Sequence, residues 1–476
     1  MSAADEFQAS HMPLRRAVPV NWLATGVAAL AVASLLAPRG LHTIVPLLLI
    51  LLVAARSLQA FSFRARSGLT LLPANAIGPI ECAIACFLIL RAATSPEPLH
   101  ALTTLVIATV YIAMMFAIMR LVSHMNGHEL HLVRRSIVFA VCVGAAFILS
   151  ELLSSLSLMT AALSGAPVLA GGNRIHFVTN GDVIEAVRPY VLDRNVAVLN
   201  LLLWPALLIA ARDARFWSLK ASYAAVPVIC MLVAAATFLS RHESSKAALV
   251  CAALIFALSR YSPKLGRAVV VAAWMIATLA VVPIVELAHK QGLHNSEFIP
   301  GSARARVVLW NYEAKQIPSN FFFGKGIDSV RYYDELQGPA AQRLPGEMAP
   351  QRNGRHSHNV YLQVWYEFGL AGAVLFMIAG LLVLRRVSRI DDADFPYINA
   401  AVVTAMTIAA FSWGMWQTWY LAAICITAVM AAVALEKRSS GRLFAVVSTE
   451  SFAASRFKRT NTAGRRAPYS SRHRWP

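Results

Sequence analysis

The sequence predicts an all-α, polytopic membrane protein with about twelve transmembrane helices and a long non-cytoplasmic loop that contains short helices. Hydrophobic residues make up 58% of the 476 positions and charged residues only 14%, with a mean hydropathy of +0.57. Apolar runs of roughly 20 residues, the length that crosses a bilayer, recur along the chain. Arginine and lysine are concentrated in alternate connecting loops, which is the pattern that orients membrane proteins.

The apolar runs form two groups of spans on either side of the longest polar loop. We place nine spans within residues 20–287 and three within residues 360–435. The run at 247–259 is short and 414–418 leaves little room for a turn, so a re-entrant hairpin is an alternative at these places. The expected spans are 20–37, 41–55, 74–90, 99–119, 136–159, 195–211, 221–239, 247–259, 268–287, 360–384, 396–413 and 417–435.

The basic residues of alternate loops orient these spans. Short loops on the cytoplasmic side of a membrane protein are enriched in arginine and lysine. This pattern places both terminal segments, 1–19 and 436–476, in the cytoplasm, and the basic, serine-rich tail is expected to be disordered. The basic loops contain Arg56, Arg64 and Arg66; Arg120, Arg134 and Arg135; Arg212, Arg215 and Lys220; Arg260, Lys264 and Arg267; and Arg385, Arg386 and Arg389.

The net charge of +19 is explained by a membrane and needs no nucleic acid. Most basic residues lie in the cytoplasmic loops and the tail, where anionic lipid headgroups are the expected partners. The six cysteines all fall within predicted spans, so we interpret them as packing residues and not as a disulfide framework or a metal site. The sequence contains neither a Walker loop nor a dinucleotide fingerprint, which argues against an ATP-driven pump.

Three polar segments fall on the opposite side of the membrane: the loops 160–194 and 288–359, and the turn from Ser240 to Lys246. Basic residues outnumber acidic residues in the loop 288–359. A loop of this length escapes the charge rule that orients short loops, so its basic residues are free to serve a ligand. We therefore expect the functional site on this side.

Residues 301–317, within the long loop, predict a helix that lies at the membrane surface. Ser302 is the expected N-cap, and Pro318 ends the run. Arg306 and Trp310 are four residues apart and share one face, either as part of a site or as a structural cation–π pair. The following Phe-Phe-Phe-Gly-Lys-Gly segment at 321–326 is interpreted as a membrane-interface anchor, with a mobile lid as the alternative.

Arginines and histidines gather where water meets the apolar runs. The segment 355–359, Arg-His-Ser-His-Asn, directly precedes the run that begins at 360. Ionisable groups at such depth are costly and usually mark a site, although an ordinary polar flank is the alternative. Arg188, Arg194 and Arg241 lie at the mouths of other spans. Guanidinium groups bind phosphate through paired hydrogen bonds, so this set predicts a site for a polyanionic, lipid-carried substrate.

One stretch of this boundary resembles a known family. His358-Asn359, followed after nine residues by Gly369-Leu370-Ala371-Gly372, is similar to the pattern of bacterial O-antigen ligases. The similarity covers about 190–385, and the related O-antigen and exopolysaccharide polymerases share this architecture. The segment 242–246 is more polar than the family pattern. Further matches in the family's order are Arg194-Asn195 with Ala197, Ser240-Arg241, Arg306 with Trp310, and Gly324-Lys325-Gly326.

The resemblance implies a metal-independent, inverting glycosyl transfer on the periplasmic face of the bacterial inner membrane, without a cofactor or a nucleotide sugar. The donor would be an undecaprenyl-diphosphate-linked glycan, and the acceptor a sugar hydroxyl of lipid A-core or of a growing glycan. His358 would be the general base, because the ordinary pKa of histidine lies near neutrality, and Arg306 would stabilise charge on the leaving diphosphate. The expected diphosphate-binding residues are Arg194, Arg241 and Arg304, and the expected orienting residues are Asn359, Tyr361 and Trp310.

Two alternative functions stay open beside ligation to lipid A-core, which is the first interpretation. Polymerisation of repeat units uses the same chemistry and differs only in the acceptor. A polyanion transporter is more distant, because broken helices in two matching halves are typical of that class and the sequence shows no such symmetry. A metal site at His356 and His358 would need a further ligand, and none stands at a familiar spacing.

The orientation is testable with reporter fusions. Alkaline phosphatase, which folds only outside the cytoplasm, should be active when fused near Gln337 in the long loop. The same enzyme fused near Ile390, in the basic loop 385–395, should be inactive. The reverse pattern would overturn both the orientation and the side on which we expect the site.

Overall fold

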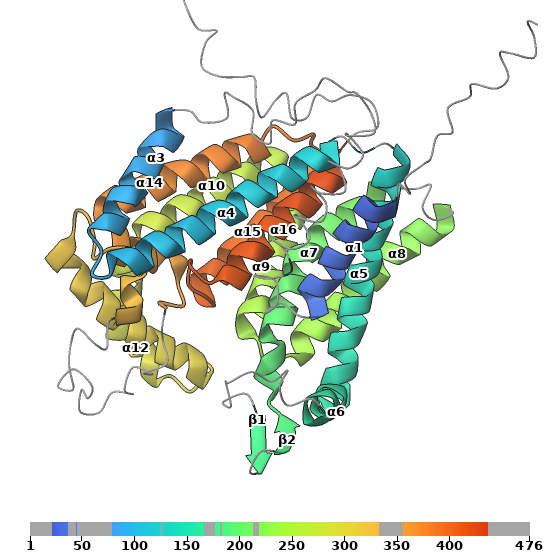
Figure 1. Cartoon of the computed structure of the whole chain (residues 1–476), viewed down its shortest axis with the longest axis horizontal. Helices are drawn as coiled ribbons and strands as arrows, with labels where there is room; N and C mark the ends of the chain where they lie inside the picture. Colours follow the sequence, from blue (N-terminus) through green and yellow to red (C-terminus); the bar gives the residue numbers. More distant parts are fainter. Residues whose placement is uncertain are drawn as a thin grey trace, which may run out of the picture.

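The structure, a computed structural model, describes residues 21–36, 44, 79–123, 125, 127–165, 177–180, 183–212, 219–332 and 356–436. Long helices dominate it and pack side by side in a slanted bundle (Figure 1). The helices are α1 (Asn21–Leu36), α3 (Pro79–Ala93), α4 (Pro98–Ser123), α5 (Gly127–Leu153), α6 (Ser157–Gly165), α7 (Asp193–Arg212), α8 (Leu219–Leu239), α9 (Glu243–Tyr261), α10 (Pro263–Leu279), α11 (Val281–Lys290), α12 (Gly301–Gln316), α14 (Val360–Val387), α15 (Phe395–Phe411) and α16 (Thr418–Leu435).

The helices confirm a polytopic, mostly helical membrane protein. Among the described residues, 6 helices are long and apolar enough to cross a membrane, and α10 with α11 would make 7 if this bent pair is one span. A described helix overlaps each expected span except 41–55, which lies outside the described residues apart from Ile44. The count of twelve spans therefore stays a prediction, and the tail from residue 437 also lies outside the described part of the chain.

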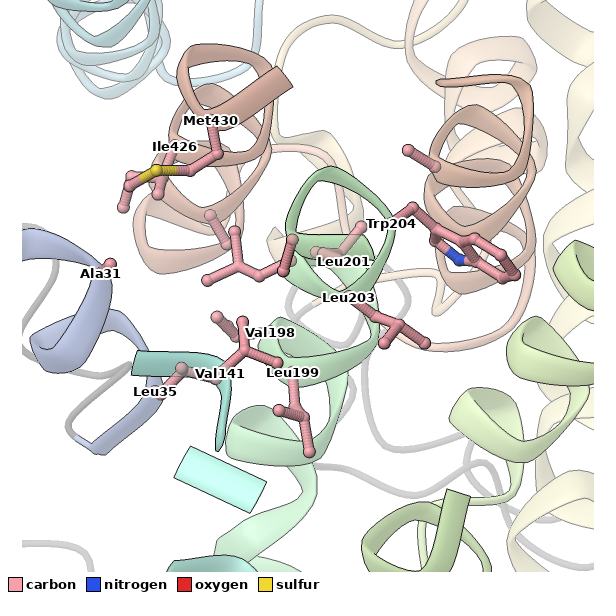
Figure 2. Packing of buried hydrophobic residues seen from close by; sticks show 14 of the residues in the cluster. Ala31, Leu35, Val141, Val198, Leu199, Leu201, Leu203, Trp204, Ile426 and Met430 are labelled. Atoms are coloured by element: carbon pink, nitrogen blue, oxygen red, sulfur yellow. The ribbon is translucent and has the colours of Figure 1, made fainter. Parts of the chain in front are cut away.

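Helix α7 forms the centre of the larger hydrophobic core. Side chains on all of its faces are buried, as expected for a helix that is apolar all round. Figure 2 shows Val198 of α7 beside Val141 of α5 and Leu35 of α1, while Trp204 points to the other side of the helix. The Trp204 indole donates to Thr404 Oγ1 of α15 at 2.9 Å, so a buried polar group is satisfied between helices. This packing places the N-terminal residue pair Asp193-Arg194 at one end of the bundle.

Two expected spans are wrong as straight helices. The expected span 268–287 breaks at Ala280, where α10 and α11 meet at an angle of 71°. The expected span 136–159 ends earlier, because α5 stops at Leu153 and the chain turns through Ser155 and Leu156, which both have positive φ. Sequence hydropathy does not register either turn, since the residues on both sides are apolar.

Helix α14 is also broken, at Gly369 (φ 62°, ψ −157°), a conformation that only glycine adopts readily. A break inside a membrane helix frees backbone groups that need new partners. On the N-terminal side of the break, the carbonyls of Tyr366 and Glu367 accept hydrogen bonds from the backbone N–H groups of Lys325 and Gly326, at 2.9 and 2.8 Å. The segment 321–326 thus takes the place of the missing helical turn.

The same segment satisfies the C-terminal side of the break. The backbone N–H groups of Leu370 and Ala371 donate to the carbonyls of Phe321 and Phe322, at 2.8 and 3.0 Å. The rings of 321–323 are 42–64% exposed, although their backbone is fixed in the helix break. This arrangement suits the anchor interpretation better than a mobile lid, and both stay predictions.

The connections on the site's side contain short elements. The strands β1 (Phe177–Asn180) and β2 (Val183–Val187) form an antiparallel hairpin with an irregular register after Val178, and both lie with α6 and α12 toward the lower edge of Figure 1. The expected helix 301–317 is present as α12. Its N-cap is Pro300 and not Ser302, because the first helical residue is Gly301.

Replacing Gly369 with alanine should destabilise the protein strongly. A Cβ there would lie 2.5 Å from Phe321 O and 2.6 Å from Phe322 C, in addition to the strained φ. We expect a loss of about 3 kcal/mol or more, seen as a lower melting temperature of the purified protein. Gly292→Ala is the matched control, since Gly292 has φ 73° but nothing within 4 Å, and it should cost only about 1–2 kcal/mol. Equal destabilisation by both would contradict the close approach at the break.

Candidate functional site

The short connection between α15 and α16, residues 411–417, organises the site and is called the 411–417 loop below. At the end of α15, the carbonyls of the last residues have no helical partner and can accept other donors. The Phe411 carbonyl accepts from Arg306 Nη1 at 2.6 Å, and the adjacent Ser412 carbonyl accepts from His358 Nδ1 at 2.6 Å. Two adjacent carbonyls therefore bring together the two residues that the sequence predicted as catalytic.

The contact with Ser412 determines which nitrogen of His358 carries a proton. A carbonyl can only accept, so Nδ1 carries the hydrogen and Nε2 keeps a lone pair in the neutral ring. Burial and the neighbouring Arg306 lower the pKa of His358 to about 4, while the bond to the Ser412 carbonyl opposes this shift. The imidazole is consequently neutral at pH 7 and has one nitrogen able to accept a proton.

His356 is packed beside His358, with ring centroids 4.1 Å apart. The Gln417 amide nitrogen lies 3.2 Å from its ring nitrogens, and a Cβ on Gly414 would lie only 2.5 Å from the His356 Cβ. Burial lowers the pKa of His356 well below its ordinary value, and the positive charges of the cluster add to this. His356 is therefore a member of the cluster and not simply a flanking polar residue.

His242 is a third imidazole of the cluster, which the sequence analysis did not single out. Its Nδ1 lies 2.6 Å from Ser245 Oγ and its Nε2 lies 3.3 Å from Ser412 Oγ, while its ring stacks on Trp413. Burial, followed by the charges of Arg306 and Lys246, lowers the pKa of His242 to about 3. The unusual polarity of segment 242–246 was the available signal, because His242 and Ser244 of this segment contact the site.

Two arginines supply fixed positive charge. Arg306, on α12, also lies 3.5 Å from Ser244 Oγ, and burial lowers its pKa while the nearby Asp193 carboxylate opposes that shift. Arg194, at the start of α7, stacks over the Trp419 ring at 5.3 Å. Both guanidinium groups act electrostatically on Asp193 and His356, so they belong to one cluster. A guanidinium remains charged even when partly buried, which suits it to an anionic ligand.

Trp310, on α12, binds the segment that carries His356 and His358. Its indole donates to the Ser357 carbonyl at 2.7 Å, and its ring lies 6.2 Å from Phe411. Arg306 and Trp310 thus share a face, as the sequence predicted, but each bonds to a different carbonyl near the 411–417 loop. Trp310 is placed to orient the segment that carries His358, and this role stays a prediction.

Glu313 lies seven residues after Arg306 on the same helix and was missed by the sequence analysis. Its side chain is fully buried and faces Ser357. Burial raises the pKa of Glu313 to about 8, while the neighbouring Ser357 opposes the shift. The hydrogen bond between α12 and the histidine segment is supplied by Trp310.

The remaining predicted site residues have other contacts. Asn359 caps α14, its side chain accepting from the Leu362 backbone N–H at 3.1 Å. The Tyr361 hydroxyl points to the Met406 carbonyl at 3.4 Å, and its ring packs edge-on against Trp274. These contacts give both residues structural roles, and an orienting role in catalysis stays a prediction.

The two other predicted diphosphate ligands lie at the edge of the site. Arg241 is exposed in the turn before α9, and Arg304 is half-buried in the first turns of α12. The arginine whose charge lowers the pKa of His358 is Arg306. Within the described part of the chain, no group of three or more His, Cys, Asp or Glu side chains is arranged to hold a metal ion.

Comparison with known proteins shows which family the chain resembles. Residues 228–377 match the family model described as O-antigen ligase. The chain is 23% identical over 339 residues to a protein of Rickettsia conorii named "Putative polysaccharide ligase", covering 68% of this chain and 77% of that protein. A protein of the same name from Rickettsia bellii is 22% identical over 241 residues, covering 49% of this chain and 55% of its own length.

These matches confirm the predicted similarity to an O-antigen ligase-like family. The chain spans about half the length of the Rickettsia bellii relative and about three quarters of the Rickettsia conorii relative. The region matched by the family model contains His242, Arg306 and His358. Arg194 and the 411–417 loop lie beyond it.

Exchanging Arg306 for lysine should impair glycan transfer although the charge is conserved. A lysine cannot bind the Phe411 carbonyl and Ser244 while also presenting a fork of donors to an anion. We expect transfer to fall by about 10- to 100-fold at normal protein levels in the membrane. Arg267→Lys, on α10, is the matched control: it alters a contact with Asp392 in the connection between α14 and α15 and should transfer normally. Full activity of Arg306→Lys would remove this residue from the site.

Proposed function

We propose that this chain transfers a glycan from an undecaprenyl-diphosphate carrier to a sugar hydroxyl at the periplasmic face of the bacterial inner membrane, with both of its termini in the cytoplasm. The observation that carries this assignment is the pairing of a neutral imidazole, His358, with the fixed charge of Arg306 on two adjacent carbonyls. The similarity to proteins named polysaccharide ligase supports glycosyl transfer as the reaction class. The acidic donor and the basic cluster are complementary in charge.

The reaction is a single displacement. The acceptor hydroxyl oxygen forms a bond to the anomeric carbon of the donor glycan, while the bond from that carbon to the diphosphate oxygen breaks. The electron pair leaves with the diphosphate, where Arg306 and Arg194 stabilise the charge. The hydroxyl proton passes to Nε2 of His358. Attack from the side opposite the leaving group inverts the anomeric configuration.

The low pKa of His358 is consistent with a base that gains strength when the donor binds. Arg306 is one cause of the low pKa, and a diphosphate bound to Arg306 would offset its charge. The pKa of His358 would then rise toward its ordinary value only in the complex. Free enzyme would keep a neutral ring, ready to accept a proton, and bound enzyme would hold a stronger base.

Ligation to lipid A-core is the first assignment, because the family model and the relatives both carry ligase names. Polymerisation of repeat units requires the same donor site and the same base, and differs in the acceptor. A metal ion and a nucleotide sugar are not needed in this scheme, since the donor is already activated by its diphosphate and the arginines supply positive charge. Anionic lipids are the proposed partners of the basic loops.

Replacing His358 with alanine should abolish transfer, whereas His356→Ala should retain more activity. Removal of a general base typically costs about 10² to 10⁴ in rate, and only His358 has its Nδ1 fixed by a carbonyl so that Nε2 can accept a proton. The measurement is transfer by purified, correctly inserted protein from a lipid-linked donor, with and without EDTA. Near-normal turnover by His358→Ala would show that the base is wrongly assigned. Activity that vanishes with EDTA and returns with a divalent ion would show that a metal is required.

A further inference from the structure

Two polar side chains are fully buried on the first half of α14, within the mostly apolar run that the sequence analysis assigned to the span 360–384. Gln363 and Glu367 are both 0% exposed. They stand four residues apart on one helix face, and Gln363 Nε2 donates to Glu367 Oε1 at 2.7 Å. Buried groups of this kind are costly inside a membrane unless each atom finds a partner, and they usually mark a function. The glycosyl transfer described above does not use them directly.

The Gln363–Glu367 pair faces the 411–417 loop. The Met415 backbone N–H donates to Gln363 Oε1 at 2.9 Å, and the Trp416 indole donates to Glu367 Oε2 at 2.6 Å. A backbone N–H can only donate, so the Gln363 oxygen must face Met415 and its amide nitrogen must face Glu367. The orientation of the whole chain of hydrogen bonds is therefore determined. Gly414 also lies close to the pair, because a Cβ on Gly414 would lie 3.1 Å from the Gln363 oxygen.

Glu367 also connects this loop to the helix break. Its backbone carbonyl accepts from Gly326, and its carboxylate accepts a hydrogen bond from the backbone of Asp328. The carboxylate is thus surrounded by donors from three parts of the chain: α14, the segment after 321–326 and the 411–417 loop. Moving any one of these parts would leave a buried acceptor without its donor, which is unfavourable because the acceptor cannot bond to water instead.

The 411–417 loop needs such external support because it lies between two helices and has few backbone bonds of its own. Its first two carbonyls hold Arg306 and His358, as described above. Gln417, at its end, contacts His356. The Gln363–Glu367 pair bonds to Met415 and Trp416, which lie between the first two carbonyls of the loop and Gln417. The pair therefore acts on the middle of the loop whose two ends hold the imidazoles and the guanidinium.

We propose that Gln363 and Glu367 are positioning residues for glycan transfer, which fix the 411–417 loop so that its carbonyls hold His358 and Arg306 in reactive geometry. This inference rests on the proposed function, because it explains how the base and the cation of that reaction are placed. Neither residue touches the reacting atoms. Displacement of a reacting group by about 1 Å can cost about 10²-fold in rate. A pair that fixes the position of the 411–417 loop can therefore control the rate without touching the substrate.

A loosened loop should change the pH dependence of transfer. His358 must be neutral in the free enzyme to act as a base, so kcat/KM of the wild type should be lost only as the pH falls through about 4. Burial is the largest cause of that low pKa, ahead of Arg306, and the groups facing His358 are Arg306 and His356. A loop that moves away would expose the ring to water and would also remove the Ser412 bond. Burial is the larger of these two effects, so the pKa of His358 would rise toward its ordinary value near 6.5. The acid limb would therefore move to higher pH.

The test compares two Trp→Phe variants that each remove one indole hydrogen bond to α14. Trp416→Phe removes the bond to Glu367, whereas Trp274→Phe removes a bond from α10 to the Met377 carbonyl, away from the loop. Gln363→Met is a second variant, which keeps the side-chain length but removes both polar atoms. We expect Trp416→Phe and Gln363→Met to reduce kcat/KM by about 10- to 100-fold and to move the acid limb upward from pH 4. Trp274→Phe should keep the wild-type pH profile.

Hydrogen exchange of the full-length purified protein gives a readout that does not depend on activity. The Met415 amide is protected by Gln363, so peptides covering 412–420 should exchange faster in Gln363→Met than in wild type or Trp274→Phe. The positioning role would be overturned if Trp416→Phe and Gln363→Met fold and keep the wild-type pH profile. It would also be overturned if Trp274→Phe moved the acid limb as far as these two variants do. Failure of the proposed function has a different result: His358→Ala would then be active, while exchange at Met415 would still respond to Gln363→Met.

Discussion

Backbone hydrogen bonding in an apolar environment is the constraint on which the site depends. A membrane-embedded helix that ends or breaks leaves carbonyl and N–H groups that cannot be left to lipid. This chain breaks α14 at Gly369 and fills the break with the backbone of 321–326, and it ends α15 with two carbonyls that accept from Arg306 and His358. The groups freed by interrupted helices thus become the framework that holds the polar cluster.

Charge and burial then decide the protonation states within that framework. Burial and a neighbouring guanidinium lower the pKa of His242, His356 and His358, so three imidazoles stay neutral beside fixed positive charge. Such a cluster is prepared for an anion, because the arginines need a counter-charge and the histidines do not compete for it. Binding of a diphosphate would both neutralise the arginines and strengthen the base, which couples donor binding to proton transfer.

The parts of the site that the sequence predicted are those with a motif or a charge at a span's mouth. His358, Arg306, Trp310 and Arg194 come together as expected, because helical spacing and the water boundary are visible in one dimension. The contributions of the 411–417 loop and of the Gln363–Glu367 pair were missed, since a carbonyl carries no sequence signal and two polar residues barely alter the hydropathy of a long apolar run. The bend at Ala280 and the turn after α5 were missed for a similar reason: apolar residues continue through the first, and only a few serines interrupt the apolar run at the second. Tertiary partners, not local propensity, determine these features.

The central claim is a single displacement with His358 as base and a lipid diphosphate as leaving group. The most direct measurement supplies purified protein in liposomes with a polyprenyl-diphosphate-linked glycan of known anomeric configuration, and offers lipid A-core and a second lipid-linked glycan as competing acceptors without any nucleotide sugar. We expect product on lipid A-core with the anomeric configuration inverted. Extension of the second lipid-linked glycan instead would identify a polymerase. Retained configuration, or no transfer from the lipid-linked donor to either acceptor, would rule out a single displacement from this donor.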